Sequence, residues 1–360
     1  MSIFLVVGTR PQIIKTAPLV LEALRQGLEL KIIHTGQHYD RELSQVFFEE
    51  LSSPEPLFNL NVGSGTHVFQ TAEIMQRLEK HLTEEKPSLV LTPGDTNSAL
   101  ASALTSAKMQ IPVGHIESGA RCYDMKMAEE INRRLIDHCS SFLFAPTRNC
   151  QNNLKKESVF GKIYLTGDTM YDAFLDFQSK TQSSTILERL QLKDKEYALL
   201  TTHRAENVDD PAKLNGIIKA IQTAKMETIF PVHPRTQKRL DENSICLSST
   251  NIQTIDPVGY IDMLALLKHS KMTITDSGGL QKEAFWSKTP CITIREKTEW
   301  TETTEMGVNF ITGVDPLKIR LAIENIQENY AEIKNRFTIN PFGDGKASNK
   351  IVRIIKQNIK

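Results

Sequence analysis

The chain has 360 residues, a length that fits two domains of ordinary size better than one. Its hydrophobic fraction of 40% and charged fraction of 24% are typical of a globular protein with a sizeable core. The formal net charge is zero, so the composition gives no general attraction to nucleic acid or to an anionic membrane. Any site for an anionic ligand must therefore be built locally from a few placed groups.

The five cysteines are odd in number and include no CxxC pair, which favours reduced thiols in a cytosol over disulfides or a zinc site. No apolar run approaches the roughly 20 residues that span a bilayer, and the first apolar stretch, residues 3–7, is too short for a signal peptide. We therefore expect a soluble cytoplasmic protein. No spacing of potential ligands predicts a bound metal ion.

The first half of the chain alternates short apolar runs with amphipathic helical patterns. The apolar runs are residues 3–7, 30–34, 88–91, 113–116 and 142–145. The helical patterns are residues 18–25, 68–82, 98–109 and 130–138. This alternation predicts a parallel sheet that is covered by helices on both faces.

A polar stretch over residues 178–196 carries no strand pattern, and we interpret it as a connection between two lobes. The alternation then resumes, with apolar runs at residues 197–201, 228–232, 252–255, 272–275 and 291–294. The predicted fold class is therefore α/β, with two successive doubly wound lobes at residues 1–175 and 190–342. Ligands of such sheets bind at the carboxyl ends of the strands, so the residues that follow each strand are the candidates for a site.

The turn after the first strand has the sequence GTRPQ. Gly8 permits a tight turn, Pro11 suits the start of a helix, and exposed amides there would attract a phosphate group. Arg10 and Lys15 add positive charge on that side. An ordinary turn with surface cations is the alternative interpretation.

Three carboxylates follow neighbouring strands or begin the next helix. Asp95 follows the run at 88–91, and its alternative role is a plain helix cap. Glu117 follows the run at 113–116 and could instead be a solvated loop residue. Glu129 and Glu130 begin a helix, where favourable interaction with the helix dipole accounts for one of them. A convergence of Asp95, Glu117 and Glu129 on one rim of a sheet predicts paired acid and base groups.

The second lobe supplies groups that suit a diphosphate. His203 and Arg204 follow its first strand and could provide a proton donor and a phosphate partner, or a structural histidine. The segment TDSGGLQKE at 275–283 ends a strand, turns at Ser277, Gly278 and Gly279, and begins a helix that could hold a pyrophosphate. Glu283 could face a ribose diol. Neither a GxGxxG nor a GxxxxGK[ST] motif is present, so the sequence predicts no nicotinamide cofactor and no P-loop.

Eight segments together resemble the non-hydrolysing UDP-N-acetylglucosamine 2-epimerase family. They are GTRPQIIK (8–15), PGDTNS (93–98), HIESGAR (115–121), EEINR (129–133), HRAEN (203–207), HPRT (233–236), TDSGGLQKEA (275–284) and NPFGDGKAS (340–348). The resemblance implies a GT-B fold, in which two Rossmann-like lobes flank a cleft and the last helix, about 343–360, packs back on the first lobe. It also implies a homodimer.

The family's reaction, as the resemblance implies it, inverts C2 of UDP-N-acetylglucosamine without a cofactor, by elimination of UDP to a 2-acetamidoglucal and its re-addition. Matching motifs assign the acid and base positions to Asp95, Glu117 and Glu129, and place His203 beside the leaving diphosphate. The implied substrate contacts are Arg10, Lys15, Arg204, Val258, Met263, Ser277, Gly278, Gly279 and Glu283. The family supplies precursors of surface polysaccharides such as lipopolysaccharide.

One departure from the family pattern bears on the substrate. Well-known members have an Arg-Pro pair after Thr-Glu, whereas this chain has Thr298-Glu299-Trp300. Together with DPVGYIDM at 256–263, this block is similar to the branch that acts on UDP-2,3-diacetamido-2,3-dideoxy-glucuronate. Three further functions fit parts of the same pattern, namely a GT-B glycosyltransferase, a hydrolysing relative and a non-catalytic sugar-nucleotide sensor.

Overall fold

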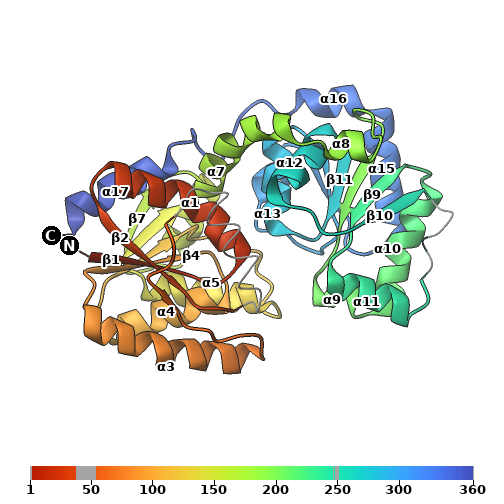
Figure 1. Ribbon diagram of the computed structural model, residues 1–360. Coiled ribbons are helices and arrows are strands. Elements are labelled where there is room, and N and C mark those ends of the chain that lie inside the picture. The colour runs from red at the N-terminus through yellow and green to blue at the C-terminus, as the bar shows by residue number, and fades with distance from the viewer. Residues whose placement is uncertain (1, 38–53, 246, 248–250, 360) are drawn as a thin grey trace. The chain divides into compact units, whose positions relative to one another are not determined.

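The computed structural model describes residues 2–37, 54–245, 247 and 251–359. The chain divides into two compact units, residues 1–175 with 341–360, and residues 176–340 (Figure 1). Each unit contains one parallel sheet with helices on its faces. The prediction of an α/β protein with two Rossmann-like, doubly wound lobes is confirmed.

The first unit has a seven-stranded sheet in the order β3-β2-β1-β4-β5-β6-β7. Its strands are β1 (Ser2–Val7), β2 (Glu29–His34), β3 (Phe58–Asn59), β4 (Leu89–Pro93), β5 (Val113–Ile116), β6 (Phe142–Ala145) and β7 (Lys162–Leu165). Its helices are α1 (Arg10–Arg25), α3 (His67–Glu85), α4 (Asn97–Lys108), α5 (Ala128–Cys139), α6 (Arg148–Lys156), α7 (Thr169–Gln178) and α17 (Ala347–Asn358). The strand order changes direction between β1 and β4, so the turns after these strands lie at the point where ligands of such sheets bind.

The second unit has a six-stranded sheet in the order β10-β9-β8-β11-β12-β13. Its strands are β8 (Ala198–Thr201), β9 (Thr228–Pro231), β10 (Ile252–Ile255), β11 (Met272–Thr275), β12 (Cys291–Thr293) and β13 (Asn309–Ile311). Its helices are α8 (Ile186–Arg189), α9 (Ala205–Val208), α10 (Pro211–Thr223), α11 (Pro234–Glu242), α12 (Tyr260–His269), α13 (Gly278–Trp286), α14 (Thr301–Glu305), α15 (Pro316–Glu328) and α16 (Tyr330–Asn335), with the 3-10 helix η1 (Ser179–Ser183). Here the order changes direction between β8 and β11.

The cores explain why the continuous apolar runs become central strands. Phe4, Val6, Ile33 and Val90 from three strands pack with Leu78 of α3 in the first unit. Tyr197, Leu199 and Ile229 pack with Leu266 and Ala284 in the second. A strand that is buried on both faces cannot show the two-residue alternation of a half-exposed strand, so it reads as an unbroken apolar run.

The stretch 178–196, which the sequence predicts as a connection between two lobes, contains η1 and α8. Both of these short helices belong to the second unit, which begins at Asp176. The final helix α17 packs against α1 in the first unit. Asp172 of α7 accepts hydrogen bonds from the backbone amides of Ala347 and Ser348, and so binds the first turn of α17.

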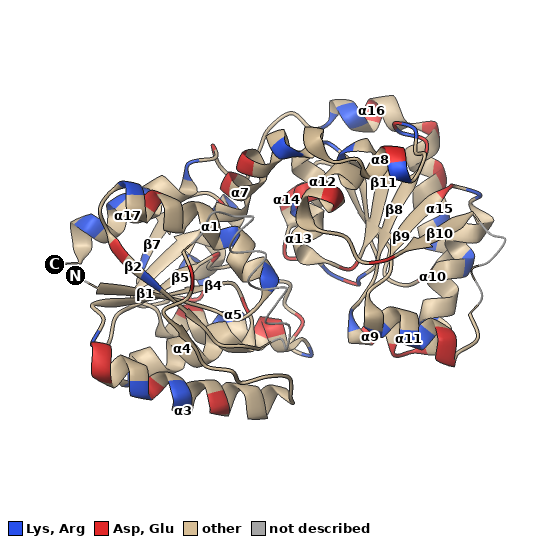
Figure 2. Cartoon of the chain, in the orientation of Figure 1, with Lys and Arg blue, Asp and Glu red and all other residues tan. Residues whose placement is uncertain are grey.

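Charged residues of both signs occur along the outer helices, as α3 illustrates (Figure 2). This mixture agrees with the formal net charge of zero. Within the described residues, no helix combines the length and the apolar character that crossing a bilayer requires.

Candidate active site

The turn after β1 is fixed by Gln12. Its Oε1 accepts hydrogen bonds from the amides of Gly8 (2.8 Å) and Thr9 (3.2 Å), and its Nε2 donates to the carbonyl of Pro93 at the end of β4 (2.7 Å). One side chain therefore ties together the two turns that flank the point where the strand order changes. The prediction that exposed amides of this turn attract phosphate is wrong for Gly8 and Thr9, because Gln12 already accepts from both.

Lys15 and Glu117 form a close ion pair at this edge of the sheet. Lys15 Nζ lies 3.0 Å from both carboxylate oxygens, and each side chain is only 10% exposed. Gly94, with φ of 68°, lies against the pair, because a Cβ there would come within 3.2 Å of Lys15 Nζ. Glu117 itself has φ of 69°, a left-handed conformation that is uncommon for a residue with a side chain. Such strain is often concentrated at functional sites.

Asp95 is held from two directions by α5. Arg133 Nε and Nη2 donate to its Oδ2 at 2.9 and 2.6 Å, and Asn132 donates to its carbonyl at 2.8 Å. The Asp95 side chain keeps a 25% exposed fraction, while that of Arg133 is 5%. Thr96, not Asp95, caps α4 through its side chain. The plain helix-cap interpretation of Asp95 is thus wrong, and its carboxylate is oriented by a buried cation.

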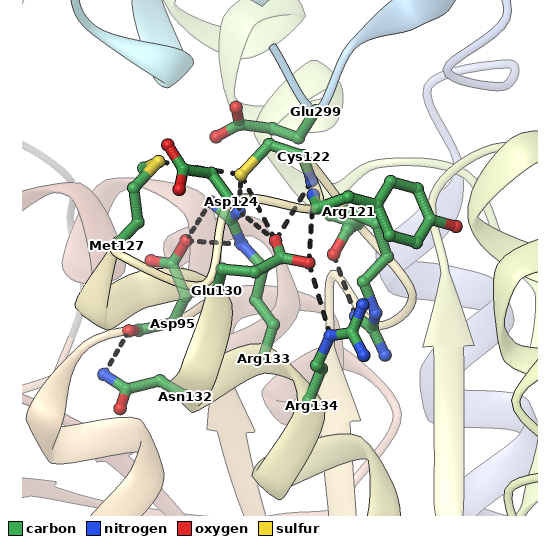
Figure 3. A network of polar contacts seen from close by, with 12 residues as sticks. Asp95, Arg121, Cys122, Asp124, Met127, Glu130, Asn132, Arg133, Arg134 and Glu299 are labelled. Atoms are coloured by element: carbon green, nitrogen blue, oxygen red, sulfur yellow. Dashed lines mark hydrogen bonds and ion pairs between the residues drawn. The ribbon is translucent and has the colours of Figure 1, made fainter. Parts of the chain in front are cut away.

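The two glutamates at the start of α5 have different surroundings. Glu130 is fully buried and accepts from the amides of Cys122 (3.0 Å) and Tyr123 (3.2 Å), with Arg133 Nη1 at 3.2 Å (Figure 3). It therefore anchors the loop that precedes α5. Glu129 is half-buried, in the first turn of the same helix. The sequence pattern alone does not distinguish two adjacent glutamates in the first turn of a helix. Of the two, Glu129 keeps the access to solvent that a reacting group requires.

In the second unit, Asp276 organises the equivalent turns. It is fully buried, and its Oδ2 accepts from Thr202 Oγ1 (2.8 Å), the amides of His203 (3.1 Å) and Arg204 (3.0 Å), and Asn207 Nδ2 (3.1 Å). Asp276 lies within the motif at 275–283, but its role was missed from the sequence. A carboxylate directly after a strand and before a Ser-Gly-Gly turn is the signal that could have found it.

His203 lies at the rim of this arrangement. Its Nδ1 is 3.4 Å from Asp276 Oδ1, and its side chain is 46% exposed. Arg204 Nε donates to the carbonyl of Asp276 at 3.0 Å, which draws the arginine toward the turn after β11. Both residues therefore lie beside the start of α13, where the sequence predicts a phosphate site.

Ser277 caps α13 by accepting from the amide of Leu280, and Gly278 and Gly279 follow. A Cβ on Gly278 would lie 2.9 Å from Glu299 Oε1, so a side chain at this position meets a buried carboxylate. Trp300 donates its indole N–H to the carbonyl of Gly278 (3.0 Å). The tryptophan that stands at the family's arginine position is therefore buried and supports the first turn of α13.

A cavity of about 560 Å³ lies in the second unit. Val258, Val232, Pro234 and Asp256 are among its lining residues. Met263 is not among them and packs against the apolar core of the unit. Glu283, on α13, is 4% exposed. In the described part of the chain, no group of three His, Cys, Asp or Glu side chains is arranged to hold a metal ion.

The family model of UDP-N-acetylglucosamine 2-epimerase matches residues 22–356. The chain belongs to this epimerase family. The UDP-N-acetylglucosamine 2-epimerase of Methanocaldococcus jannaschii is 43% identical over 366 residues, with 99% of both chains covered. Its solved structure in complex with UDP-GlcNAc and UDP superimposes with a TM-score of 0.91 and covers 99% of this chain and 100% of that chain, at 42% identity. The resemblance inferred from the eight motifs is confirmed, and the chain is an isomerase of the epimerase type.

A second relative has a different substrate. The UDP-2,3-diacetamido-2,3-dideoxy-D-glucuronate 2-epimerase of Pseudomonas aeruginosa is 42% identical over 321 residues, with 87% of this chain and 88% of that protein covered. The family thus includes both of the substrate branches that the sequence suggests.

Within this epimerase fold, the predicted residues fall into two groups. Asp95 follows β4, and Glu117 follows β5. Arg10 and Lys15 lie on α1, which begins after the turn that follows β1. Glu129 lies in the first turn of α5. His203, Arg204, Ser277, Gly278 and Gly279 follow β8 and β11 of the second sheet, with Glu283 on α13 and Val258 at the cavity. The meeting of the two groups around one substrate stays a prediction.

Proposed function

We propose that this chain is a non-hydrolysing C2 epimerase that interconverts UDP-GlcNAc and UDP-ManNAc. The observation that carries the proposal is the pairing of carboxylates with buried cations where the strand order of the first sheet changes. Asp95 is bound to Arg133 and Glu117 to Lys15, so two oriented acid–base groups occupy the usual ligand position of a doubly wound sheet. Membership of the epimerase family supports the same conclusion.

The reaction requires a base at C2 and stabilisation of a departing diphosphate. A carboxylate removes the C2 proton, the electron pair of that bond forms the C1–C2 double bond, and the C1–O bond breaks to release UDP. UDP then adds back at C1 while a proton reaches C2 from the opposite face. We assign the proton transfers to Asp95, Glu117 and Glu129, because general acid and base groups must lie within hydrogen-bonding reach of the reacting carbon.

The second unit binds the UDP part of the substrate in this proposal. The amides at the start of α13 and the side chains of His203 and Arg204 stabilise the diphosphate, where negative charge develops as the C1–O bond breaks. Glu283 binds the ribose. The cavity beside Val258 receives the uracil ring, while Met263 supports the core beneath it. Arg10 and Lys15 contact the sugar and phosphate side from the first unit.

The diacetamido-uronate is the alternative substrate. It is favoured by the Pseudomonas aeruginosa relative and by Trp300, which replaces an arginine of the family pattern. The chemistry at C2 is the same for both substrates. They differ in the carboxylate at C5, so the uronate must meet a cation that UDP-GlcNAc does not need.

Two further features complete the proposal. We place the enzyme in the cytoplasm, where it supplies UDP-ManNAc-type precursors of surface polysaccharides. We also propose a homodimer, which the exposed apolar side chains of α5 support. Ile131 and Leu135 lie four residues apart on α5 and are 40% and 44% exposed, so this face of the helix offers apolar side chains to a partner subunit. Sedimentation at several protein concentrations tests the dimer.

Incubation of the purified protein with each UDP-sugar, followed by proton NMR, tests the function. We expect the C2-inverted epimer of UDP-GlcNAc to appear while total nucleotide sugar stays constant. Accumulation of free UDP and free sugar would instead identify a hydrolase. Turnover only after an acceptor sugar is added would identify a glycosyltransferase, and turnover of the uronate alone would identify the second branch. No turnover with either sugar would contradict an enzymatic role.

A further inference from the structure

The motif HIESGAR contains a histidine and an arginine that the proposed reaction does not use. His115 lies on β5, two residues before Glu117, and Arg121 follows the same turn. Both side chains are fully buried and meet at the carboxylate of Asp137 on α5. His115 Nδ1 is 2.6 Å from Asp137 Oδ1, and Arg121 Nη2 is 2.7 Å from Asp137 Oδ2.

The other ring nitrogen of His115 contacts the turn that carries Asp95. Its Nε2 lies 2.8 Å from the carbonyl oxygen of Gly94. A carbonyl oxygen can only accept a hydrogen bond, so Nε2 carries a proton. Residue 94 directly precedes Asp95, and the histidine therefore holds the backbone from which that carboxylate projects.

Asp137 also fixes the far side of the Glu117 turn. Its Oδ2 accepts from the amide of Gly119 at 3.1 Å, in addition to the arginine. Asp137 thus binds the residue two positions before Glu117 and the residue two positions after it. This double attachment explains how Glu117 is kept in its left-handed conformation.

The donors around Asp137 decide its charge. Burial would raise the pKa of Asp137, but His115 and Arg121 together lower it below its ordinary value. Arg121 and the amide of Gly119 both donate to Asp137 Oδ2, as expected for an ionised carboxylate, and the 2.6 Å contact between His115 Nδ1 and Asp137 Oδ1 then requires a proton on Nδ1. Both ring nitrogens then donate, and the imidazole is an imidazolium.

The charges of this cluster balance. Arg121 Nη2 also lies 2.7 Å from Glu157 Oε2, so two cations alternate with two carboxylates. Among the described residues, Glu157 has two further neighbours. His138 Nε2 lies 3.6 Å from its Oε2, and Arg134 Nη2 lies 3.9 Å from its Oε1. The balance permits a charged histidine in a buried position, because each buried charge has a partner.

We infer that His115 is a doubly protonated positioning residue, which fixes the Asp95 and Glu117 turns and contributes a buried positive charge beneath them. This inference rests on the proposed function for its catalytic consequence. A neighbouring positive charge favours ionised carboxylates. His115 therefore helps to keep the carboxylates of the site ready to accept a proton.

The protonation state is measured first in the active wild-type enzyme, by nitrogen NMR of ¹⁵N-histidine-labelled protein with the His115 ring assigned through its backbone. We expect both ring nitrogens to be protonated near neutral pH, because each lies against a hydrogen-bond acceptor. A ring with one unprotonated nitrogen near neutral pH would overturn the inference. This result does not depend on whether the enzyme acts on any UDP-sugar.

The catalytic consequence is measured with His115→Gln, which keeps an amide group that can donate hydrogen bonds but carries no charge. We expect kcat to fall roughly 10- to 100-fold, because the loss of the contacts of His115 displaces the reacting carboxylates slightly. KM should change less than about twofold. The acidic limb of the kcat profile should move to higher pH by roughly one unit. An unmoved limb with reduced kcat would show a purely structural role and contradict the inference.

His81→Gln is the matched control. His81 is half-buried in the same unit and stacks on Phe58 at 4.1 Å, away from the site. We expect its kcat and pH profile to match the wild type, and a limb shifted as in His115→Gln would overturn the assignment to His115. If the wild-type enzyme fails to invert C2, the proposed function fails, while the NMR result still decides the charge of His115.

Discussion

At the scale of single residues, Glu129 and Glu130 are neighbours to which we assign different roles, with acid–base chemistry proposed for Glu129 and a structural contact for Glu130. We expect Glu129→Gln to lower kcat at least about 100-fold, because it removes an acid–base group, and to leave stability nearly unchanged. Glu130→Gln should cost about 3 kcal/mol of unfolding free energy, because it breaks a buried contact with Arg133. Urea unfolding and steady-state kinetics of both variants separate these effects. Equal stability losses in the two variants would contradict the assignment.

A second residue-scale prediction concerns acid. The pKa of Asp137 is lowered in the folded protein, although burial acts in the opposite direction, because His115 and Arg121 lie beside it. The stability that it contributes is therefore present above the unfolded value of about 3.9 and is lost as pH falls through the lower folded value. Urea midpoints should fall steeply below about pH 4. Near neutral pH, the urea midpoint of Asp137→Asn should be lower than that of the wild type. Below about pH 4, it should depend less on pH than the wild-type midpoint does.

At the scale of elements, the turn after β5 depends on Gly119. Its φ is 81°, and a Cβ would lie 2.3 Å from the carbonyl oxygen of Cys150, which belongs to the backbone of α6. Gly27 has a similar φ of 67° with open space around it. We expect Gly27→Ala to cost about 1 kcal/mol, the cost of the left-handed conformation, and Gly119→Ala to cost clearly more. Equal costs, measured by thermal or urea unfolding, would contradict the close contact.

The elements that the sequence predicts best are the buried central strands. Residues 113–116, 142–145 and 272–275 form strands with the predicted bounds, since a fully buried strand is continuously apolar. Residues 252–255 also form a strand with the predicted bounds, although β10 lies at a sheet edge and only Ile252 is buried in it. Some short strands at the sheet edges were missed, among them β7, in which no residue is fully buried. The predicted helix at 18–25 begins at Arg10 instead, because α1 continues through Pro18.

The site was predicted unevenly for a similar physical reason. Residues such as Asp95 and Ser277 follow strands in the sequence, so the sheet topology predicts where they lie. Their partners come from distant segments. Arg133 binds Asp95 across 38 positions and Asp276 binds His203 across 73, and no local pattern reports such contacts.

At the scale of the whole molecule, the chain returns to its first unit at the end. Asp172 binds the first turn of α17, and Asn349 donates to Glu22 of α1. Removal of residues 341–360 should therefore expose the face of α1 and destabilise the first unit. Hydrogen exchange should increase in β1 and α1, with β8 and β11 nearly unchanged. A uniform increase over both units would contradict the assignment of α17 to the first.

In the proposed reaction, a carboxylate removes the proton from C2 and another proton returns from the opposite face. The direct measurement is proton NMR of UDP-GlcNAc that is incubated with the enzyme in deuterated water. We predict that, at equilibrium, both UDP-GlcNAc and its epimer carry one deuterium at C2 and that both sugars remain linked to UDP. Inversion that keeps the original proton on C2 would contradict the account.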